Sequence, residues 1–278
     1  MYVYEPRGIL FLSSVKKFES FPEFATMREG ARVDNLTHTL TGLMISRCGI
    51  SDSKTRGAAL TAMIAANAPD VDVLWSGLPG GSSYFEYHRG ITHSFVMVPI
   101  LAAACCAIAK YTRQASMNVR LFAVAILGVL SHLLLDWTNV YGIRLLLPFS
   151  SKWYRGDMTE IIDPIILAIL FLSLFAPMLA NLVVGEIGAK KGTATLTWAR
   201  FALVALLGYE SARFVAHARA LAMIQSHLYG GSVEPRFTVV PARLGLLTWR
   251  GIVEGEDYVV TSLVDIPGEY NPADGHVD

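Results

Sequence analysis

The stretch Tyr87-His88-Arg89-Gly90-Ile91-Thr92-His93-Ser94 places two histidines and an arginine directly before a long apolar run, Phe95 to Ala109. Polar and charged side chains at the mouth of a membrane helix are costly, and they therefore indicate function. Histidine and arginine, together with glycine, threonine and serine, favour a metal or an anion over simple packing. The other unusual polar residues of the chain are predicted to converge on this junction.

The composition indicates a membrane protein. The 278 residues are 53% hydrophobic and only 17% charged, whereas a soluble domain carries about 25% charged residues, and the mean hydropathy is +0.43. The net charge of zero gives no indication of a nucleic-acid partner, so none is expected. The three cysteines, Cys48, Cys105 and Cys106, lie in apolar runs, so they are interpreted as packing residues without a disulfide framework.

Apolar runs predict the fold class: an all-α polytopic membrane protein with about five to six transmembrane helices and a small C-terminal β-rich extramembrane domain. The runs cover residues 36–50, 57–68, 95–109, 121–137, 164–184 and 196–209. The fifth run is long enough to cross a hydrocarbon core of about 30 Å. Several of the others are shorter than the roughly 20 residues that a full span requires, so they need polar ends or tilt to cross.

Changes in composition divide the chain into three parts. Residues 1–33 are predicted to form a polar N-terminal leader, and residues 34–228 a transmembrane helical domain that holds the metal site. Residues 229–278 are rich in β-branched and aromatic side chains, and Gly255-Glu256-Asp257 is typical of a hairpin turn. This last part is predicted to be a small β-rich domain outside the bilayer.

Counting membrane faces along the chain brings ligand-type residues to one side. If each apolar run crosses the bilayer, the starts of the odd-numbered helices and the ends of the even-numbered helices share a face. The residues that fall on this face are His38, Asp70, Asp72, His88, His93, His132, Asp136 and Asp163. Scattered structural residues would not be expected to sort to one depth in this way.

This set predicts a shared metal site. His132 and Asp136 are spaced i, i+4 and share a helix face, and Asp70 and Asp72 flank one residue on an irregular segment. Imidazole and carboxylate ligands fit a divalent transition metal, with zinc expected first and manganese or iron as alternatives. Because the set exceeds the four ligands of one tetrahedral ion, either two ions are bound or some members orient the ligands.

Each residue also has a purely structural interpretation. A single histidine in a membrane helix is more often a hydrogen-bond partner of another helix. Asp70 and Asp163 suit helix capping, and Arg89 suits a side chain that reaches the lipid headgroups. For the whole set, a shared metal site is favoured over these separate explanations. Glu210 and Arg213 are interpreted as an i, i+3 pair within one helix.

Short motifs that occur in a fixed order carry a resemblance to a known family. They are Asp34-Asn35-Leu36-Thr37-His38-Thr39, Ala68-Pro69-Asp70-Val71-Asp72, His88-Arg89-Gly90-Ile91-Thr92-His93-Ser94, Ser131-His132 with Asp136, and Asp163-Pro164. Together they resemble the YdjM-like family of bacterial inner-membrane proteins, which are described as metal-dependent hydrolases. The likeness covers about residues 34–184. It implies a multi-pass protein of the bacterial inner membrane with hydrolase activity, and it implies no particular substrate.

The leading hypothesis is an integral-membrane, metal-dependent hydrolase that acts at the membrane surface on an ester or phosphoester. Its catalytic residues are predicted to be Arg89, His93 and His132. Arg89, with Thr92 or Ser94, is expected to hold an anionic group, because a guanidinium suits phosphate. A site at the depth of the lipid headgroups favours a lipid-linked substrate.

The rival hypothesis is a non-enzymatic metal-binding membrane protein, either a transporter or a sensor. An ion path should continue across the membrane with polar residues, but the opposite halves of the helices, such as Leu101–Ala109 and Leu170–Ala176, are nearly featureless. This disfavours transport. A structural membrane protein without a metal would leave the one-sided sorting unexplained.

Basic residues predict the orientation in the membrane. The loops on the face away from the predicted site carry Arg47, Lys54, Arg56, Lys110, Arg113, Arg120, Lys190 and Lys191. The positive-inside rule assigns that face to the cytoplasm. The metal site and the C-terminal domain are then predicted to lie on the periplasmic or outer face, with the lipid bilayer as the main partner.

Overall fold

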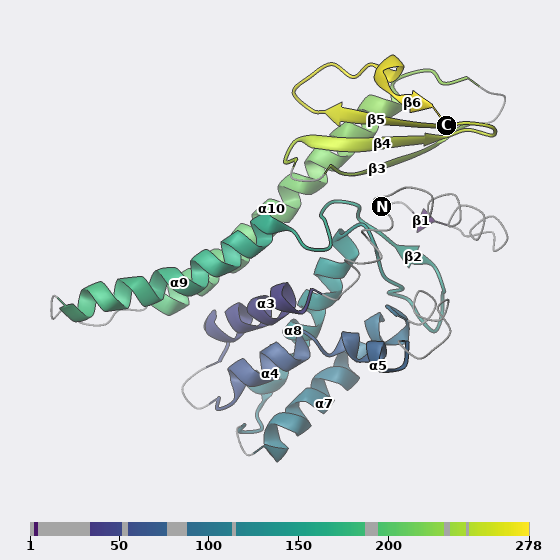
Figure 1. Cartoon of the computed structure of the whole chain (residues 1–278). Helices are drawn as coiled ribbons and strands as arrows, with labels where there is room; N and C mark the ends of the chain where they lie inside the picture. Colours follow the sequence, from purple (N-terminus) through teal and green to yellow (C-terminus); the bar gives the residue numbers. More distant parts are fainter. Residues whose placement is uncertain are drawn as a thin grey trace.

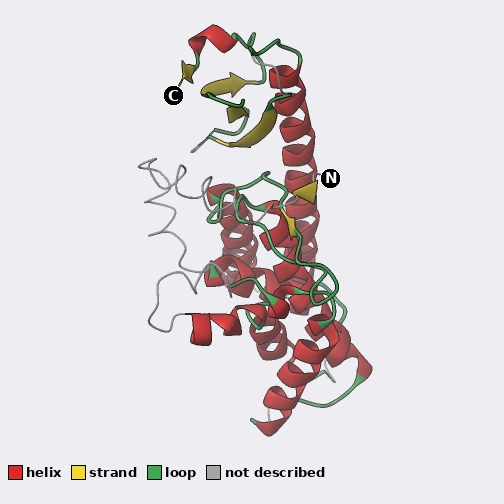
Figure 2. Cartoon of the chain, turned by 90° about the vertical axis from the view of Figure 1, so that its right-hand side faces the viewer, coloured by secondary structure: helices red, strands yellow, loops and turns green. Residues whose placement is uncertain are grey.

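The chain folds into a helical bundle that carries a small antiparallel sheet at one end (Figures 1 and 2). The computed structural model describes residues 3–4, 34–51, 55–76, 88–112, 115–186, 194–230, 234–242 and 245–277. From the predicted leader they include only strand β1 (Val3–Tyr4), which pairs with β2 (Trp153–Tyr154). The rest of the predicted leader lies outside the described residues.

The bundle consists of α3 (Asn35–Arg47), α4 (Ala58–Ala65), α7 (Met97–Tyr111) and α8 (Val119–Thr138). Side-chain caps fix where two of these helices begin, because the cap satisfies a backbone N–H that has no partner within the helix. The carboxylate of Asp34 accepts from the N–H of Thr37 at 3.1 Å. The side-chain oxygen of Asn118 accepts from the N–H of Leu121 at 2.8 Å.

Helix α4 lies between α3 and α8 at close range. A Cβ atom at Gly42 of α3 would lie 2.6 Å from the carbonyl oxygen of Ala62, and one at Gly128 of α8 would lie 3.0 Å from the same oxygen. Both approaches depend on the missing side chain, which lets another backbone come close. The two glycines therefore set the spacing of three helices.

Helices α9 (Pro164–Glu186) and α10 (Ala194–Gln225) form an antiparallel pair that projects from the bundle (Figure 1). The first half of α10 packs on α9 and α3 through an apolar cluster that includes Leu170, Ala202 and Leu206. The second half supports the sheet. With 32 residues, α10 is about 48 Å long, so one continuous helix joins the two parts.

The sheet is antiparallel with the strand order β3-β4-β5-β6. Its strands are β3 (Arg236–Pro241), β4 (Thr248–Glu254), β5 (Val259–Asp265) and β6 (His276–Val277). Alternate side chains of the strands turn toward α10, as the period of two of a strand dictates. Trp249 and Val264 are fully buried there against Ile224 of α10.

The prediction of five to six transmembrane helices is wrong. Among the described residues, α8 is the one helix that is long and apolar enough to cross a membrane, and the apolar segment Pro164–Ala180 of α9 is shorter. Helices α3, α4 and α7 have 13, 8 and 15 residues. At about 1.5 Å per residue they measure about 20, 12 and 22 Å, less than a hydrocarbon core of about 30 Å. The apolar runs 36–50 and 57–68 are longer than helices α3 and α4 because they include residues of the adjoining turns.

Candidate metal centre

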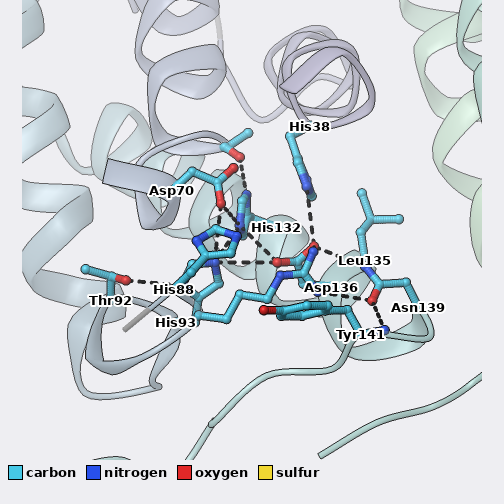
Figure 3. A network of polar contacts seen from close by, with 12 residues as sticks. His38, Asp70, His88, Thr92, His93, His132, Leu135, Asp136, Asn139 and Tyr141 are labelled. Carbon is cyan, nitrogen blue, oxygen red and sulfur yellow. Dashed lines mark hydrogen bonds and ion pairs between the residues drawn. The ribbon is translucent and has the colours of Figure 1, made fainter. Parts of the chain in front are cut away.

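Irregular segments at one end of the bundle bring the predicted residues together (Figure 3). Helix α4 is followed by a 3-10 turn, η1 (Pro69–Asp72), and α7 is preceded by another, η2 (Ile91–His93). The two turns contact each other, and η1 also contacts α8. The side chains of these turns therefore meet residues from the C-terminal part of α8 and from α3.

Donor atoms from Asp70, His93, His132 and Asp136 face one another, and we refer to these residues as the cage. The Nε2 atoms of His93 and His132 are 3.1 Å apart. Each of these nitrogens lies 3.5 Å from Oδ1 of Asp70. Oδ2 of Asp136 lies 3.5 Å from Nε2 of His93 and 3.4 Å from Nε2 of His132.

The spacing of the cage fits a tetrahedral divalent ion. Nitrogen and oxygen ligands bind zinc at about 2.0–2.1 Å, so the edge of such a tetrahedron is about 3.3–3.4 Å. The donor-to-donor distances given above run from 3.1 to 3.5 Å. Two protonated nitrogens would repel at the 3.1 Å that separates the histidines, whereas two unprotonated nitrogens that share a cation would not.

Hydrogen bonds behind the cage orient both imidazoles. Nδ1 of His132 lies 2.7 Å from the carbonyl oxygen of Ala66 and donates to it. Nδ1 of His93 lies 3.1 Å from the hydroxyl oxygen of Thr92 and 3.4 Å from Oδ2 of Asp72. A neutral imidazole that donates from Nδ1 presents an unprotonated Nε2, which is the usual arrangement of metal-binding histidines.

Asp72 is fully buried at the centre of a second set of contacts. Its Oδ2 accepts from the N–H of Arg89 and from the hydroxyl of Thr92, each at 2.9 Å. Its Oδ1 lies 2.9 Å from Nδ1 of His88. Donor atoms of Asp70, Asp72 and His88 lie within 4.8 Å of one another, so these residues form a second donor group that shares Asp70 with the cage.

Arg89 is 6% exposed and its guanidinium is engaged inside the protein. Nη2 pairs with Oδ1 of Asp136 at 3.0 Å. Nη1 donates to the side-chain oxygen of Asn139 at 3.1 Å and to the carbonyl of Gly142 at 3.3 Å. The guanidinium also lies over the ring of Tyr141, 4.5 Å from its centroid. These contacts position Asp136, and the expected hold on an anionic group stays a prediction.

Protonation of the metal-free cluster follows from burial and from its hydrogen bonds. Burial alone would raise the pKa of Asp70, but the charge of His132 and hydrogen bonds from the two cage histidines lower it far below its usual value. Burial alone would also raise the pKa of Asp72, but hydrogen bonds from His88 and His93 outweigh this effect, so the pKa is lowered. Burial would lower the pKa of His93, but hydrogen bonds to Asp136 and the other carboxylates raise it to about 9. An ion that binds must therefore displace a proton from His93.

His38 lies beside the cage and is not one of its donors. Its ring stacks on that of His132 with centroids 3.9 Å apart. Its Nε2 lies 3.6 Å from Oδ1 of Asp136. His38, Asp136 and Asp163 help to line a hollow of about 20 Å³, which is room for about one water molecule. The structure thus makes His38 a neighbour of two cage residues.

Asp163 reaches the edge of this hollow, where it caps α9. Its Oδ1 accepts from the N–H groups of Ile165 at 2.9 Å and Ile166 at 3.2 Å. Its Oδ2 accepts from the hydroxyl of Tyr209 at 2.8 Å. Asp163 belongs to neither donor group found among the described residues. Its contacts are those of the capping role that the sequence offered as an alternative.

Two other polar features of the sequence have structural contacts. The hydroxyl of Ser94 donates to the carbonyl of Ile91 at 2.7 Å and closes the turn η2. Glu210 accepts from the hydroxyl of Thr138 at 3.3 Å. Arg213 donates from Nε to the carbonyl of Met158 at 2.8 Å. Glu210 and Arg213 therefore bind different partners instead of serving the cage.

Sequence reasoning misses Asn139 and Tyr141. The amide of Asn139 donates to Oδ1 of Asp136 at 3.3 Å, while its oxygen accepts from Arg89. The i, i+3 spacing from Asp136 was an available signal for Asn139. No comparable signal exists for the carbonyl of Ala66, because every residue has a carbonyl.

Comparisons with known proteins agree with a membrane protein. The family described as YdjM inner membrane protein matches residues 33–220 of this chain. A relative, the uncharacterized protein YfhP of Bacillus subtilis (strain 168), is 26% identical over 194 residues, which cover 67% of this chain and 55% of YfhP. The match thus spans about half the length of that relative. No solved structure matches the chain.

Proposed function

The chain belongs to the YdjM family of inner membrane proteins, and from this premise we propose that it is a metal-dependent hydrolase of esters or phosphoesters. The observation that carries the proposal is the cage of Asp70, His93, His132 and Asp136, whose donors fit one divalent ion. Zinc is the first candidate and manganese and iron are alternatives, because two imidazoles with two carboxylates suit all three.

A divalent ion that keeps a coordination position open in this centre would lower the pKa of a water bound there and would polarise the bond to be cleaved. Hydrolysis adds the water oxygen to the phosphorus or acyl carbon, and the alcohol leaves with a proton from that water. The protein contributes the fixed orientation of the donors. Thr92 and Asp72 hold His93, the carbonyl of Ala66 holds His132, and Arg89 holds Asp136.

The charges in contact with one another also balance around a divalent ion. The carboxylates of Asp70, Asp72 and Asp136 carry three negative charges, and the guanidinium of Arg89 carries one positive charge. A divalent ion brings this sum to zero while the histidines remain neutral. Since an unbalanced buried charge costs several kcal/mol, roughly, the balance favours a doubly charged ion over a singly charged one.

The position of the cage favours a substrate at the membrane surface. Asp136 lies near the C-terminal end of α8, the candidate membrane span. With α8 across the membrane, the cage lies near the lipid headgroups, which favours a lipid-linked ester such as a phospholipid or a polyprenyl phosphate. Lys110 near the end of α7 and Arg120 near the start of α8 lie at the helix ends away from the cage. The positive-inside rule therefore favours a cage that faces the periplasm.

The test uses the full chain in lipid vesicles with a panel of ester and phosphoester lipids and with added Zn²⁺ or Mn²⁺. Metal-dependent release of product is expected. His93→Ala should abolish it because His93 is a cage ligand. Asp163→Asn is the matched control and should retain it, because Asp163 belongs to neither donor group.

Two results would contradict the hydrolase. Folded protein that binds neither Zn²⁺ nor Mn²⁺ would remove the basis of the proposal. Movement of metal across the vesicle membrane, without product from any member of the panel, would instead support a transporter.

A further inference from the structure

We propose that the centre binds a second divalent ion through Asp70, Asp72 and His88, with Asp70 bridging the two ions. A catalytic role of this second ion rests on the proposed function. The second ion would have the open coordination positions that water and substrate need. The donor atoms of the three residues lie within 4.8 Å of one another, as those of the cage do. Asp70 is the member common to both groups.

The two oxygens of Asp70 have different surroundings. Oδ1 faces the cage and lies 3.5 Å from Nε2 of both His93 and His132. Oδ2 is buried and has no hydrogen-bond partner within the described part of the chain. A buried polar atom without a partner costs about 1–3 kcal/mol, and more when it is charged. A cation at Oδ2 removes this cost, and a carboxylate that binds one ion with each oxygen suits the separation of about 3.5–4 Å in two-metal sites.

His88 and Asp72 have the geometry of neighbouring ligands on one ion. Nδ1 of His88 lies 2.9 Å from Oδ1 of Asp72. Two ligands bound at about 2.1 Å and at a right angle, as on an octahedral ion, are about 3.0 Å apart. Oδ2 of Asp72 is already held at 2.9 Å by the N–H of Arg89 and the hydroxyl of Thr92. Oδ1 is therefore the oxygen that an ion would bind.

The two sites differ in what they leave open. Four protein donors complete a tetrahedral ion, which is typical of structural metal sites, whereas catalytic sites keep a position for water or substrate. The group of Asp70, Asp72 and His88 supplies three donors and so leaves positions of an octahedral ion open. The second ion is thus the one that can meet water and substrate.

Charge identifies the class of substrate. With one divalent ion, the charges of the three carboxylates, Arg89 and the ion sum to zero. A second divalent ion leaves two positive charges in a buried centre, which a bound dianion would neutralise. A phosphate monoester supplies two negative charges near neutral pH, whereas a carboxylic ester supplies none. The inferred substrate is therefore a phosphate monoester at the membrane surface.

The competing explanation is that His88 only donates a hydrogen bond to Asp72 and that the cage holds a single ion. His88→Gln separates the two explanations. The glutamine amide can still donate a hydrogen bond to Oδ1 of Asp72, but it is a poor ligand for a transition metal. If His88 is only a hydrogen-bond donor, this variant should bind metal as the wild type does.

The experiment titrates the purified full chain with Mn²⁺ alone and follows metal content by elemental analysis and electron paramagnetic resonance. The wild type should bind two ions per chain and show an exchange-coupled signal, because ions about 3.5–4 Å apart interact magnetically. His88→Gln should bind one ion and show the signal of isolated Mn²⁺. Asp163→Asn, the matched control, should behave as the wild type.

One uncoupled ion in the wild type would overturn the inference, and so would two coupled ions in His88→Gln. The result is independent of the hydrolase test. Two coupled ions in a protein that cleaves nothing would refute the proposed function and leave the two-ion centre in place. Turnover with a single uncoupled ion would support the hydrolase and refute the two-ion centre. Inorganic phosphate should strengthen Mn²⁺ binding by the wild type and leave His88→Gln unaffected, because the anion offsets the positive charge that the second ion adds.

Discussion

Replacing Arg89 with lysine should weaken metal binding, because Arg89 holds Asp136 in its orientation. Lysine keeps the positive charge, but one ammonium on a flexible stem cannot reproduce the contacts of a planar guanidinium. In the wild type, Nη2 pairs with Asp136 at 3.0 Å, while Nη1 donates to Asn139 at 3.1 Å and to the carbonyl of Gly142 at 3.3 Å.

The size of the effect follows from the contacts that lysine loses. Each hydrogen bond from a charged donor contributes about 1.5–3 kcal/mol, and the two from Nη1 have no equivalent in lysine. Weaker stacking on Tyr141 adds about 1 kcal/mol. The network around Asp136 therefore loses about 4–7 kcal/mol even if lysine keeps the ion pair. Loss of a residue that orients a metal ligand lowers metal affinity about 10- to 100-fold, and this range is expected for Arg89→Lys.

The assay is competition for Zn²⁺ between a chelator and the purified full chain. Arg155→Lys is the matched control, because Arg155 is 45% exposed and pairs with Asp157 at 3.1 Å. Lysine keeps the charge of this partly exposed pair, and neither Arg155 nor Asp157 belongs to either donor group, so this control should bind metal with wild-type affinity. Wild-type affinity in Arg89→Lys would refute the positioning role. If product release from phosphorylated lipids nevertheless fell, the contact of Arg89 with a substrate anion would be supported instead.

Other changes test the packing, the protonation and the orientation of the protein. Gly42→Ala should lower Tm and metal affinity, because its Cβ would lie 2.6 Å from the carbonyl oxygen of Ala62, while Gly208→Ala has open space and is the control. Equal Tm values for the two variants would contradict the close packing. Since the pKa of His93 is about 9 and an ion displaces its proton, apparent metal affinity should rise about 50-fold between pH 7 and 9. A chelator titration without pH dependence would count against this. A cysteine at the exposed Leu263 of the sheet should react with an impermeant reagent in intact cells, and labelling only after lysis would place the sheet in the cytoplasm.

The clustering of ligands could be predicted from the sequence although the membrane spans could not. The prediction of a buried His/Asp cluster that could hold a metal is confirmed. Residues at alternate helix ends share one side of a bundle wherever successive helices run antiparallel, and short helices do this as well as full spans. His132 and Asp136 share a face of α8 because local spacing along a helix does not depend on what surrounds the helix.

The remaining features depend on tertiary contacts that no local pattern encodes. A run such as 57–68 is apolar except for Thr61 and Asn67, yet only Ala58–Ala65 is helical. An arginine next to a membrane helix suits the headgroups as well as the interior, and the partners that turn Arg89 inward, such as Asn139 and Gly142, lie about fifty residues further along the chain. An aspartate can serve as a metal ligand or as a helix cap. At the start of α9, Asp163 makes the hydrogen bond of a cap.

The C-terminal sheet lies beyond residue 220, where the family match ends, yet it is tied to the end of the bundle that holds the cage. Arg213 of α10 donates to the carbonyl of Leu246, next to β4, at 2.6 Å and to the carbonyl of Met158 at 2.8 Å. The N–H of Met158 in turn donates to the carbonyl of Thr138 at 2.8 Å, and Thr138 ends α8 just after Asp136. A shift of the sheet would therefore move the segment that anchors the end of α8. These hydrogen bonds link the sheet, through Arg213 and Met158, to the residue that ends α8.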